Sequence, residues 1–331
     1  MAILPQPRGP VSEALLTALQ QPPEPVELPT EPIDFEDLQL ALYCCYELHY
    51  RGFEGVDDAW EWDPGLLAFR AVLEAAFEAD VHELAGTPGE PPEPGRIDVE
   101  IREIMQADDA PSVSTYIERE ATREQVLEFL IHRSAYQLKE ADPHSWAIPR
   151  LHGVPKAALV EIQADEYGEG RPEQVHAQLF ARTMDAVGLD SAYGAYLDRI
   201  PGVTLATVNL MSWMGLHRRR RGGIVGHLAL FEMTSAIPNR RYGSGLRRLG
   251  WESEDAVAFF DVHVVADAVH ESIAAVDLAG GLAKQDPKLG ADVLWGARAL
   301  TAIDGRWSRH MMERWEAGGS SLHDGGVLSH S

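Results

Sequence analysis

Cysteine is almost absent from this sequence: among 331 residues only Cys44 and Cys45 occur, next to each other in the apolar stretch LQLALYCCYELHY. Adjacent cysteines rarely form a disulfide with each other, because the bond needs particular Cα and Cβ separations. We therefore expect two small buried side chains in a reducing compartment and no disulfide framework. Cysteine is not expected to supply metal-binding chemistry in this chain.

Long hydrophobic runs are also missing. No run of about 18 or more apolar residues occurs, so the sequence predicts no membrane span. The start, MAILPQPRGP, lacks the basic segment followed by an apolar one that marks a secretory signal. The hydrophobic fraction of 45% is ordinary for a globular protein with a sizeable core. Because both a secretory signal and a membrane span are missing, we expect a soluble, cytoplasmic protein.

Positive charge is scarce. Lys and Arg number 28 against 52 Asp and Glu, which gives a formal net charge of −24 and argues against nucleic-acid binding. Eight arginines are nevertheless concentrated in one part of the chain: Arg218, Arg219, Arg220, Arg221, Arg240, Arg241, Arg247 and Arg248. They form either a solvated face that balances neighbouring acids or a docking surface for an anionic substrate, cofactor or carrier domain.

Helical patterns dominate the rest of the chain. Residues 1–33 are rich in proline and glutamate, and we expect a flexible arm with one short helix near Val11–Gln20. Residues 34–316 predict one all-α domain, and residues 317–331 a disordered tail. The helices of the all-α domain are expected at 34–50, 64–84, 122–140, 155–165, 172–188, 192–215, 221–236, 252–273 and 289–316. Only LVEIQ and VTLATVNL alternate like strands.

The strongest local signal is the stretch FFDVHVVADAVHE, residues 259–271. The spacing of His263, Asp267 and His270 places them within an arc of about 60° on one helix face. That face is expected to point inward, because nearly all the intervening residues are Val or Ala. Burying two imidazoles and a carboxylate is costly unless they are paired or bound to a metal. A lone inward histidine is more often a satisfied core residue, but this combination favours a metal site.

A second group of ligand-type residues lies upstream, in VEIQADEYGEGRPEQVHAQLF. Glu173 and His176 form a Glu-x-x-His pair, which places a carboxylate and an imidazole one turn apart on a helix, as in di-iron carboxylate bundles. Glu166 falls on nearly the same stripe, unless Gly168 and Gly170 kink or break the helix.

Glu140 ends the preceding predicted helix, where LKEADPH points it toward the interior or into a cap. Each of these glutamates alone is more often a solvated surface charge, so only their combination with the histidine helix indicates a site. Oxygen and nitrogen ligands without thiolate suit iron or manganese in an oxygen-activating site. Zinc hydrolysis stays open, although three or four carboxylates exceed what one zinc needs.

With these motifs the sequence resembles the iron-containing redox enzymes of the heme-oxygenase-like di-iron oxidase superfamily. The resemblance runs from about Asp37 to Leu300 and is strongest in QLKEADPHSWAIPRL, ALVEIQADEYGEGRPEQVHAQLF, GHLALFEMTSAIPNRRY and FFDVHVVADAVHE. It implies an all-α, heme-oxygenase-like up-and-down bundle of several helices. The family's metal ligands match Glu140, Glu173, His176, His263, Asp267 and His270. Glu166 matches a further, conditional ligand of some members, and we assign it a catalytic role.

The resemblance also implies two iron ions as cofactors, O2 as co-substrate, and oxidation of a small organic substrate that bears an amine or a carboxylate. The same ligands serve several reactions, so the family does not identify the substrate. As partners we expect that substrate, an external electron donor and a possible homodimer, but neither nucleic acid nor a membrane. The alternatives are a non-redox member of the fold (a thiaminase-like or cofactorless enzyme, or a ligand-binding protein) and a structural metal bundle.

Overall fold

Helices make up the regular structure of this chain. The computed structural model describes residues 2–27 and 33–323, without the side chains of residues 94 and 265–269. In that part of the chain the only β-type contact is an isolated bridge between Ala2 and Phe53. The all-α prediction is confirmed, and both LVEIQ and VTLATVNL lie within helices. Among the described helices, none combines the length and the apolar character that crossing a membrane requires.

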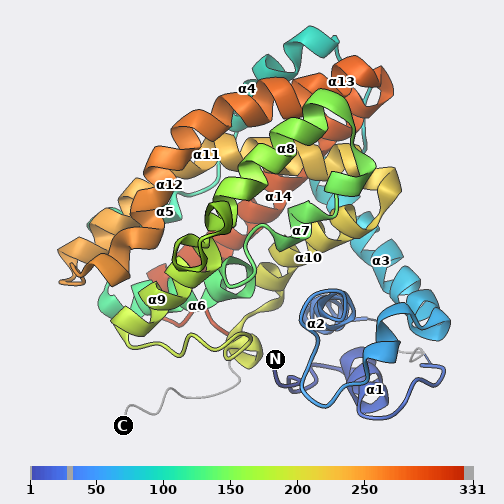
Figure 1. Ribbon diagram of the computed structural model, residues 1–331. Helices are drawn as coiled ribbons and strands as arrows, with labels where there is room; N and C mark the ends of the chain where they lie inside the picture. Colours follow the sequence, from blue (N-terminus) through green and yellow to red (C-terminus); the bar gives the residue numbers. More distant parts are fainter. Residues whose placement is uncertain (1, 28–32, 324–331) are drawn as a thin grey trace.

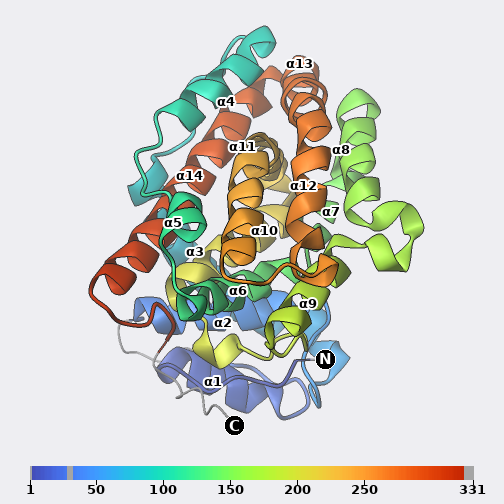
Figure 2. The ribbon, with the colours of Figure 1, turned by 90° about the vertical axis from the view of Figure 1, so that its left-hand side faces the viewer.

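The long helices lie side by side and form the body of the molecule, with the N-terminal helices at one end (Figure 1). Helix α11 lies between α12 and α14 and packs against both (Figure 2). The helices are α1 (Pro10–Leu19), α2 (Phe35–Glu47), α3 (Pro64–Ala85), α4 (Ile97–Gln106), α5 (Val113–Arg119), α6 (Arg123–Gln137), α7 (Asp142–Ser145), α8 (Gly153–Glu166), α9 (His176–Val187), α10 (Gly202–Leu216), α11 (Arg221–Arg248), α12 (Glu254–Ser272), α13 (Gly280–Gln285) and α14 (Pro287–Glu316). A π-helical segment, η8 (Ile273–Ala279), joins α12 to α13.

Side-chain caps start several of these helices where the sequence predicts them. The carboxylate of Asp34 accepts a hydrogen bond from the backbone N–H of Glu36 at the start of α2. At the start of α6, where the sequence predicts a helix from residue 122, Thr122 and Gln125 form a capping box. Such caps satisfy backbone N–H groups that have no partner inside the helix, so they set where a helix begins.

The N-terminal segment is not a flexible arm over residues 10–19, contrary to our expectation. The predicted short helix is present as α1, and its Leu15 and Leu19 are 0% exposed. Asp37 of α2 caps it, because its carboxylate accepts from the backbone N–H groups of Val11 (2.9 Å) and Ser12 (2.7 Å). Two buried leucines and a cap from another helix stabilise α1 against the domain.

The predicted tail also starts later than residue 317. The hydroxyl of Ser321 is buried and donates to Glu128 over 2.7 Å. Its oxygen also lies 3.1 Å from Nε2 of the buried His132. Residues 317–323 therefore belong to the packed domain, and residues 324–331 lie outside the described part of the chain.

Two helix boundaries differ from the prediction for reasons that involve proline. Helix α10 begins at Gly202 rather than at 192, because Pro201 forces Ile200 into an extended conformation (φ −85°, ψ 117°). Helix α11 continues through Pro238 to Arg248 instead of ending at 236. Pro238 has no N–H to donate to the carbonyl of Thr234, so packing against α12 and α14 must stabilise this part of α11. The prediction also missed α4 and α5.

Glycine allows α11 and α14 to approach backbone to backbone. A Cβ added at Gly226 of α11 would overlap the carbonyl group of Val293 on α14, and one added at Gly296 of α14 would overlap that of Gly223. Even alanine would therefore force the two helices apart. This contact fixes the position of α11, which carries one of the buried acids described below.

Candidate metal centre

Six buried carboxylate and imidazole side chains meet in the core of the bundle. Their ligand atoms form two groups, each with all atoms within 4.8 Å of one another, and Glu166 belongs to both. The first group is Glu140, Glu166, His176 and His263, and the second is Glu166, Glu232 and His270. Glu140 follows α6, Glu166 ends α8, His176 begins α9, Glu232 lies in α11, and both His263 and His270 lie in α12. Five separate segments thus converge on one place.

The first group contains two histidines whose rings lie close together, with centroids 4.4 Å apart. His263 donates from Nδ1 to the carbonyl oxygen of Phe259 over 2.6 Å, since a carbonyl can only accept. In the neutral imidazole its other nitrogen, Nε2, then carries the lone pair, and this nitrogen lies 3.7 Å from Oε1 of Glu140. Nδ1 of His176 lies 3.0 Å from Oε2 of Glu166. Burial, with His263 nearby, lowers the pKa of His176 to about 4, so this imidazole is neutral near pH 7.

The second group centres on His270. Its Nε2 lies 3.2 Å from a carboxylate oxygen of Asp165, and its Nδ1 lies 3.4 Å from Oε2 of Glu232. Nδ1 has no hydrogen-bond partner of good geometry, although it is buried. Burial lowers the pKa of His270, but Glu232, Glu166 and Asp165 outweigh that effect and raise it overall. A carboxylate that holds one imidazole nitrogen, as Asp165 does here, is the usual support for a metal-binding histidine.

The electrostatics of the cluster fit cations. Glu140, Glu166 and Glu232 are 5%, 7% and 5% exposed, and each faces a histidine across 3.0–3.7 Å. Burial raises the pKa of Glu232, which means that its ionised form is disfavoured without a partner. One oxygen of Glu140 is buried without a hydrogen-bond partner among the described residues. Three buried carboxylates are costly unless positive charge compensates them, and divalent ions bound through oxygen and imidazole ligands would do so.

The structure does not bring Glu173 to this cluster. Glu173 is exposed on a short 3₁₀ turn, Pro172–Gln174, whereas His176 begins α9 and is buried. The prediction that the two residues lie one turn apart on a single helix is therefore wrong. The helix ends at Glu166, because Gly168 adopts φ +62° and the chain folds back there, so that a Cβ on Gly168 would lie 2.6 Å from the backbone of Gln174. As a result it is Glu166, not Glu173, that faces His176.

Two further points concern the predicted ligands. The side chain of Asp267 lies outside the described residues, so its role stays a prediction. Glu232 was missed by the sequence analysis, although it is a lone acid in the otherwise apolar stretch HLALFEM of α11. An isolated carboxylate in an apolar helix was the signal that could have identified it.

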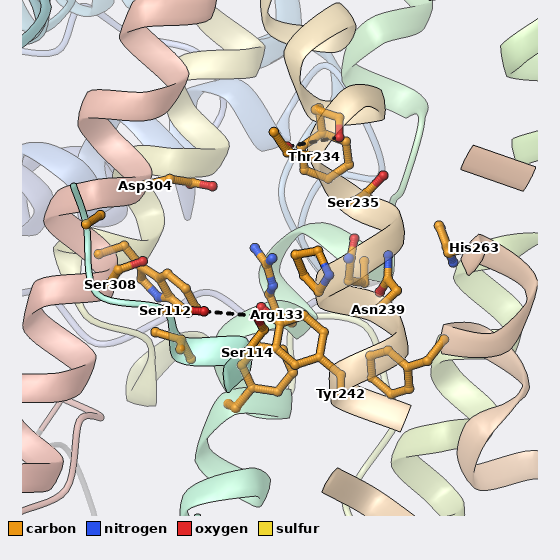
Figure 3. A pocket seen from close by; sticks show the side chains of 18 of the residues that line it. Ser112, Ser114, Arg133, Thr234, Ser235, Asn239, Tyr242, His263, Asp304 and Ser308 are labelled. Carbon is orange, nitrogen blue, oxygen red and sulfur yellow. Dashed lines mark hydrogen bonds between the residues drawn. The ribbon is translucent and has the colours of Figure 1, made fainter. Parts of the chain in front are cut away.

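A cavity of about 240 Å³ opens beside the cluster. Glu140 and His263 line one end, and Arg133, Asp304 and Ser308 lie away from His263 (Figure 3). Its walls include aromatic side chains and polar ones from α6, α9, α11, α12 and α14: Phe129, Gln137, Phe180, Phe231, Thr234, Asn239, Tyr242, Phe259, Phe260 and Trp307. A pocket that combines aromatic walls with polar groups, next to a candidate metal site, is suited to bind a small molecule.

The clustered arginines do not line this cavity in the described part of the chain. Arg219 and Arg220 pair with Glu78 at the start of α11, and Arg247 pairs with Asp261. Arg248 donates to the backbone carbonyls of Ile117, Glu118 and Ala121. Apart from Arg220, which is buried over the ring of Trp213, these contacts support the interpretation of a solvated face that balances neighbouring acids.

Comparison with known proteins agrees with the site. The profile of a family described as "Iron-containing redox enzyme" matches residues 127–305, which include all six residues of the cluster. A nitrosourea synthase of Streptomyces achromogenes subsp. streptozoticus is 27% identical over 137 residues. That alignment covers 41% of this chain and only 29% of the relative.

Proposed function

Because the chain belongs to the family of iron-containing redox enzymes, we propose that its buried cluster binds two ferrous ions and that the protein uses O2 to oxidise a small organic molecule. The observation that carries this proposal is the convergence of three buried carboxylates and three buried histidines on one place. A shared carboxylate between two ligand groups is the arrangement by which helical bundles hold two metal ions. Bound iron would supply the electrons that reduce O2.

The chain's own residues would contribute binding, orientation and exclusion of water. Glu140, His176 and His263 would hold one ion, Glu232 and His270 the other, and Glu166 would bridge them. The Phe259 carbonyl and the Asp165 carboxylate keep His263 and His270 in the orientation that a ligand needs. Asp267 is included in the proposal as a further ligand on α12.

The cavity beside Glu140 and His263 would hold the substrate. Phe180, Phe231 and Phe259 form apolar walls at this place, so a bound molecule would exclude water from the reacting atoms. The nitrosourea synthase supports an oxidation of this general kind. The substrate and an external electron donor are parts of this proposal.

The proposal is tested by loading the protein with Fe(II) without O2 and measuring iron per chain. We expect about two ions, with clearly less in His176→Ala and in His263→Ala. His152→Ala is the matched control, because His152 is exposed. Consumption of O2 by the loaded protein, measured with an oxygen electrode, should fall in the first two variants and not in the control. Wild-type iron content in both cluster variants would overturn the proposal and favour a non-redox member of the fold.

A further inference from the structure

Ala141, directly after the candidate ligand Glu140, has an unusual backbone conformation. Its φ is 71° and its ψ is −28°, in the left-handed region. A Cβ makes this region unfavourable, and apart from Glu169 no other residue with a side chain has a positive φ in the described part of the chain. Such strain persists only where neighbouring groups hold it, and it is often found at functional sites. Ala141 must therefore be held by its surroundings.

Gln163 of α8 holds the Ala141 peptide. The side chain of Gln163 is buried, and its amide Nε2 donates to the carbonyl oxygen of Ala141 over 2.9 Å and to Oγ of Ser145 over 2.7 Å. Only the NH2 group of an amide can donate to a carbonyl, so these contacts fix the orientation of the amide. One side chain thus binds both ends of the short loop that follows Glu140.

A second tie joins the same loop to the end of α8. The hydroxyl of Tyr167 donates to a carboxylate oxygen of Asp142 over 2.8 Å and lies 2.9 Å from Oγ of Ser145. In sequence, Gln163 and Tyr167 stand on either side of the candidate ligand Glu166. The segment that carries Glu166 therefore also holds the loop that follows Glu140.

The side chain of Gln163 also lies next to the candidate metal centre. It lines a void of about 10 Å³ together with Glu140, Glu166, Glu232 and His263. Ligand atoms of Glu140 and Glu166 lie within 4.8 Å of each other. Glu140 directly precedes Ala141, and Glu166 follows Gln163 by about one helical turn. The hydrogen bond between Gln163 and Ala141 therefore connects the backbone segments of two candidate ligands.

We propose that Gln163 is a positioning residue of the metal centre: its hydrogen bond keeps Ala141 left-handed and thereby directs the Glu140 carboxylate toward Glu166. The inference rests on the proposed function, since it concerns how that site keeps two of its ligands together. Without this hydrogen bond the backbone of Ala141 relaxes to a negative φ, which turns Glu140 away from the cluster. Replacing a group that orients a metal ligand typically lowers metal affinity by about tenfold to a hundredfold.

The first test measures metal binding by variants. Gln163→Met keeps the approximate size of the side chain and removes both donated hydrogen bonds. In stepwise Fe(II) titrations without O2, it should raise the dissociation constant of the ion held by the first ligand group by about tenfold or more. The ion held by Glu232 and His270 is the internal reference and should change less. Gln178→Met, at an exposed residue of α9, is the matched control and should bind both ions as the wild type does.

Ala141→Gly separates positioning from packing. Glycine adopts the left-handed conformation without steric cost, so it does not need Gln163 to hold it there. The double variant Ala141→Gly/Gln163→Met should therefore recover most of the affinity that Gln163→Met loses. The visible absorption of bound Co(II), which reports the geometry of its ligands, should also return toward that of the wild type. A loss of affinity that Ala141→Gly does not restore would mean that Gln163 acts through packing alone, and it would overturn the inference.

The same relationship is measurable without metal. In urea unfolding of the metal-free protein, Ala141→Gly should raise the midpoint in the wild-type background, because it removes the strain. It should not raise the midpoint in the Gln163→Met background, where the strain is already released. Ala157→Gly, at an exposed helical position of α8, is the control and should lower the midpoint about equally in both backgrounds. Equal effects of Ala141→Gly in the two backgrounds would overturn the inference.

Tyr167→Phe serves if Gln163→Met does not fold, since it removes only one hydroxyl. It should weaken the same ion by a smaller factor, because Gln163 still holds Ala141. Unchanged iron affinities in both variants would reject the inference alone and leave the proposed function standing. If the wild type binds no iron, the proposed function fails, and the metal-free comparison still decides whether Gln163 positions Ala141.

Discussion

Nδ1 of His176 lies 3.0 Å from Oε2 of Glu166, although the two residues are ten positions apart and the end of a helix lies between them. Glu166 is the last residue of α8, and His176 is the first of α9. The turn between them brings a carboxylate and an imidazole together without a shared helix face. This contact between Glu166 and His176 replaces the Glu-x-x-His pair that the sequence predicted.

Replacing Glu232 and replacing Glu173 should affect iron binding differently. Glu232→Gln should reduce the iron content of the anaerobically loaded protein from about two ions per chain to about one, because the second ligand group loses its own carboxylate. Glu173→Gln should keep the wild-type content, since Glu173 is exposed on a turn. Iron analysis after desalting measures both. Loss of iron in Glu173→Gln would mean that the loop closes differently in the loaded protein.

Glu166 should matter to both ions. Because Glu166 belongs to both ligand groups, Glu166→Ala should weaken the binding of each ion, whereas Glu232→Gln should weaken only one. Stepwise titration with Fe(II), followed by competition with a chelator of known affinity, separates the two dissociation constants. One ion held as tightly as in the wild type would show instead that Glu166 is a conditional ligand of the other ion alone.

The fold was predictable where the information is local. Helices were predicted from residues 34 and 122, and both are confirmed, because Asp34 and the Thr122–Gln125 pair mark these helix starts through contacts within a few residues. The spacing of His263 and His270 correctly placed both on one helix, because helical periodicity is also a local property. Spacing alone could not show that the helix carrying Glu166 stops before Glu173.

The remainder depends on contacts between distant parts of the chain. No residue near 10–19 in the sequence indicates that Asp37 caps α1. Likewise, no residue near Glu232 in the sequence indicates that it lies beside Glu166 and His270. The cavity likewise combines Arg133 of α6 with Trp307 of α14, which become neighbours only when the bundle is packed. Sequence reasoning could identify such residues as unusual, but it could not bring them together.

Acid should destabilise the protein through His132, which lies outside the metal cluster. Burial lowers the pKa of His132 to about 3, from about 6.5 in an unfolded chain. Between these values the unfolded state binds the proton and the folded state does not, so stability falls as pH decreases below about 6.5. From pH 7 to pH 5 this histidine should cost about 2 kcal/mol in the free energy of unfolding.

The measurement is urea unfolding of the metal-free protein at both pH values. His132→Gln should lose about 2 kcal/mol less than the wild type between them, whatever its stability at pH 7. The amide preserves polar contacts to Thr204 and Ser321, which lie 2.6 Å and 3.1 Å from the imidazole nitrogens in the wild type. Equal losses in the two proteins would show that His132 becomes protonated in the folded state.

The contact between α11 and α14 should tolerate no side chain at Gly226. Gly226→Ala should destabilise the protein by about 3 kcal/mol or more, because the new Cβ overlaps the backbone of Val293 and neither helix can yield locally. Gly89→Ala is the control, since a Cβ at Gly89 meets no atom within 4 Å, and its effect should stay within about 0.5 kcal/mol. Denaturant midpoints compare the two. A mild effect at Gly226 would mean that α11 shifts as a whole, and iron binding through Glu232 should then change as well.

The turn between Glu166 and His176 couples metal occupancy to the local stability of the chain. A cation bound to both residues would act as a cross-link across residues 167–175, which include the left-handed conformations of Gly168, Glu169 and Gly170. Opening of this segment and release of the ion then become one linked equilibrium. At a free metal concentration of about a hundred times the dissociation constant, the fraction of molecules with this segment open would fall by about a hundredfold. Proteolytic nicking or amide exchange in this segment would therefore report on metal occupancy without any need to detect the metal itself.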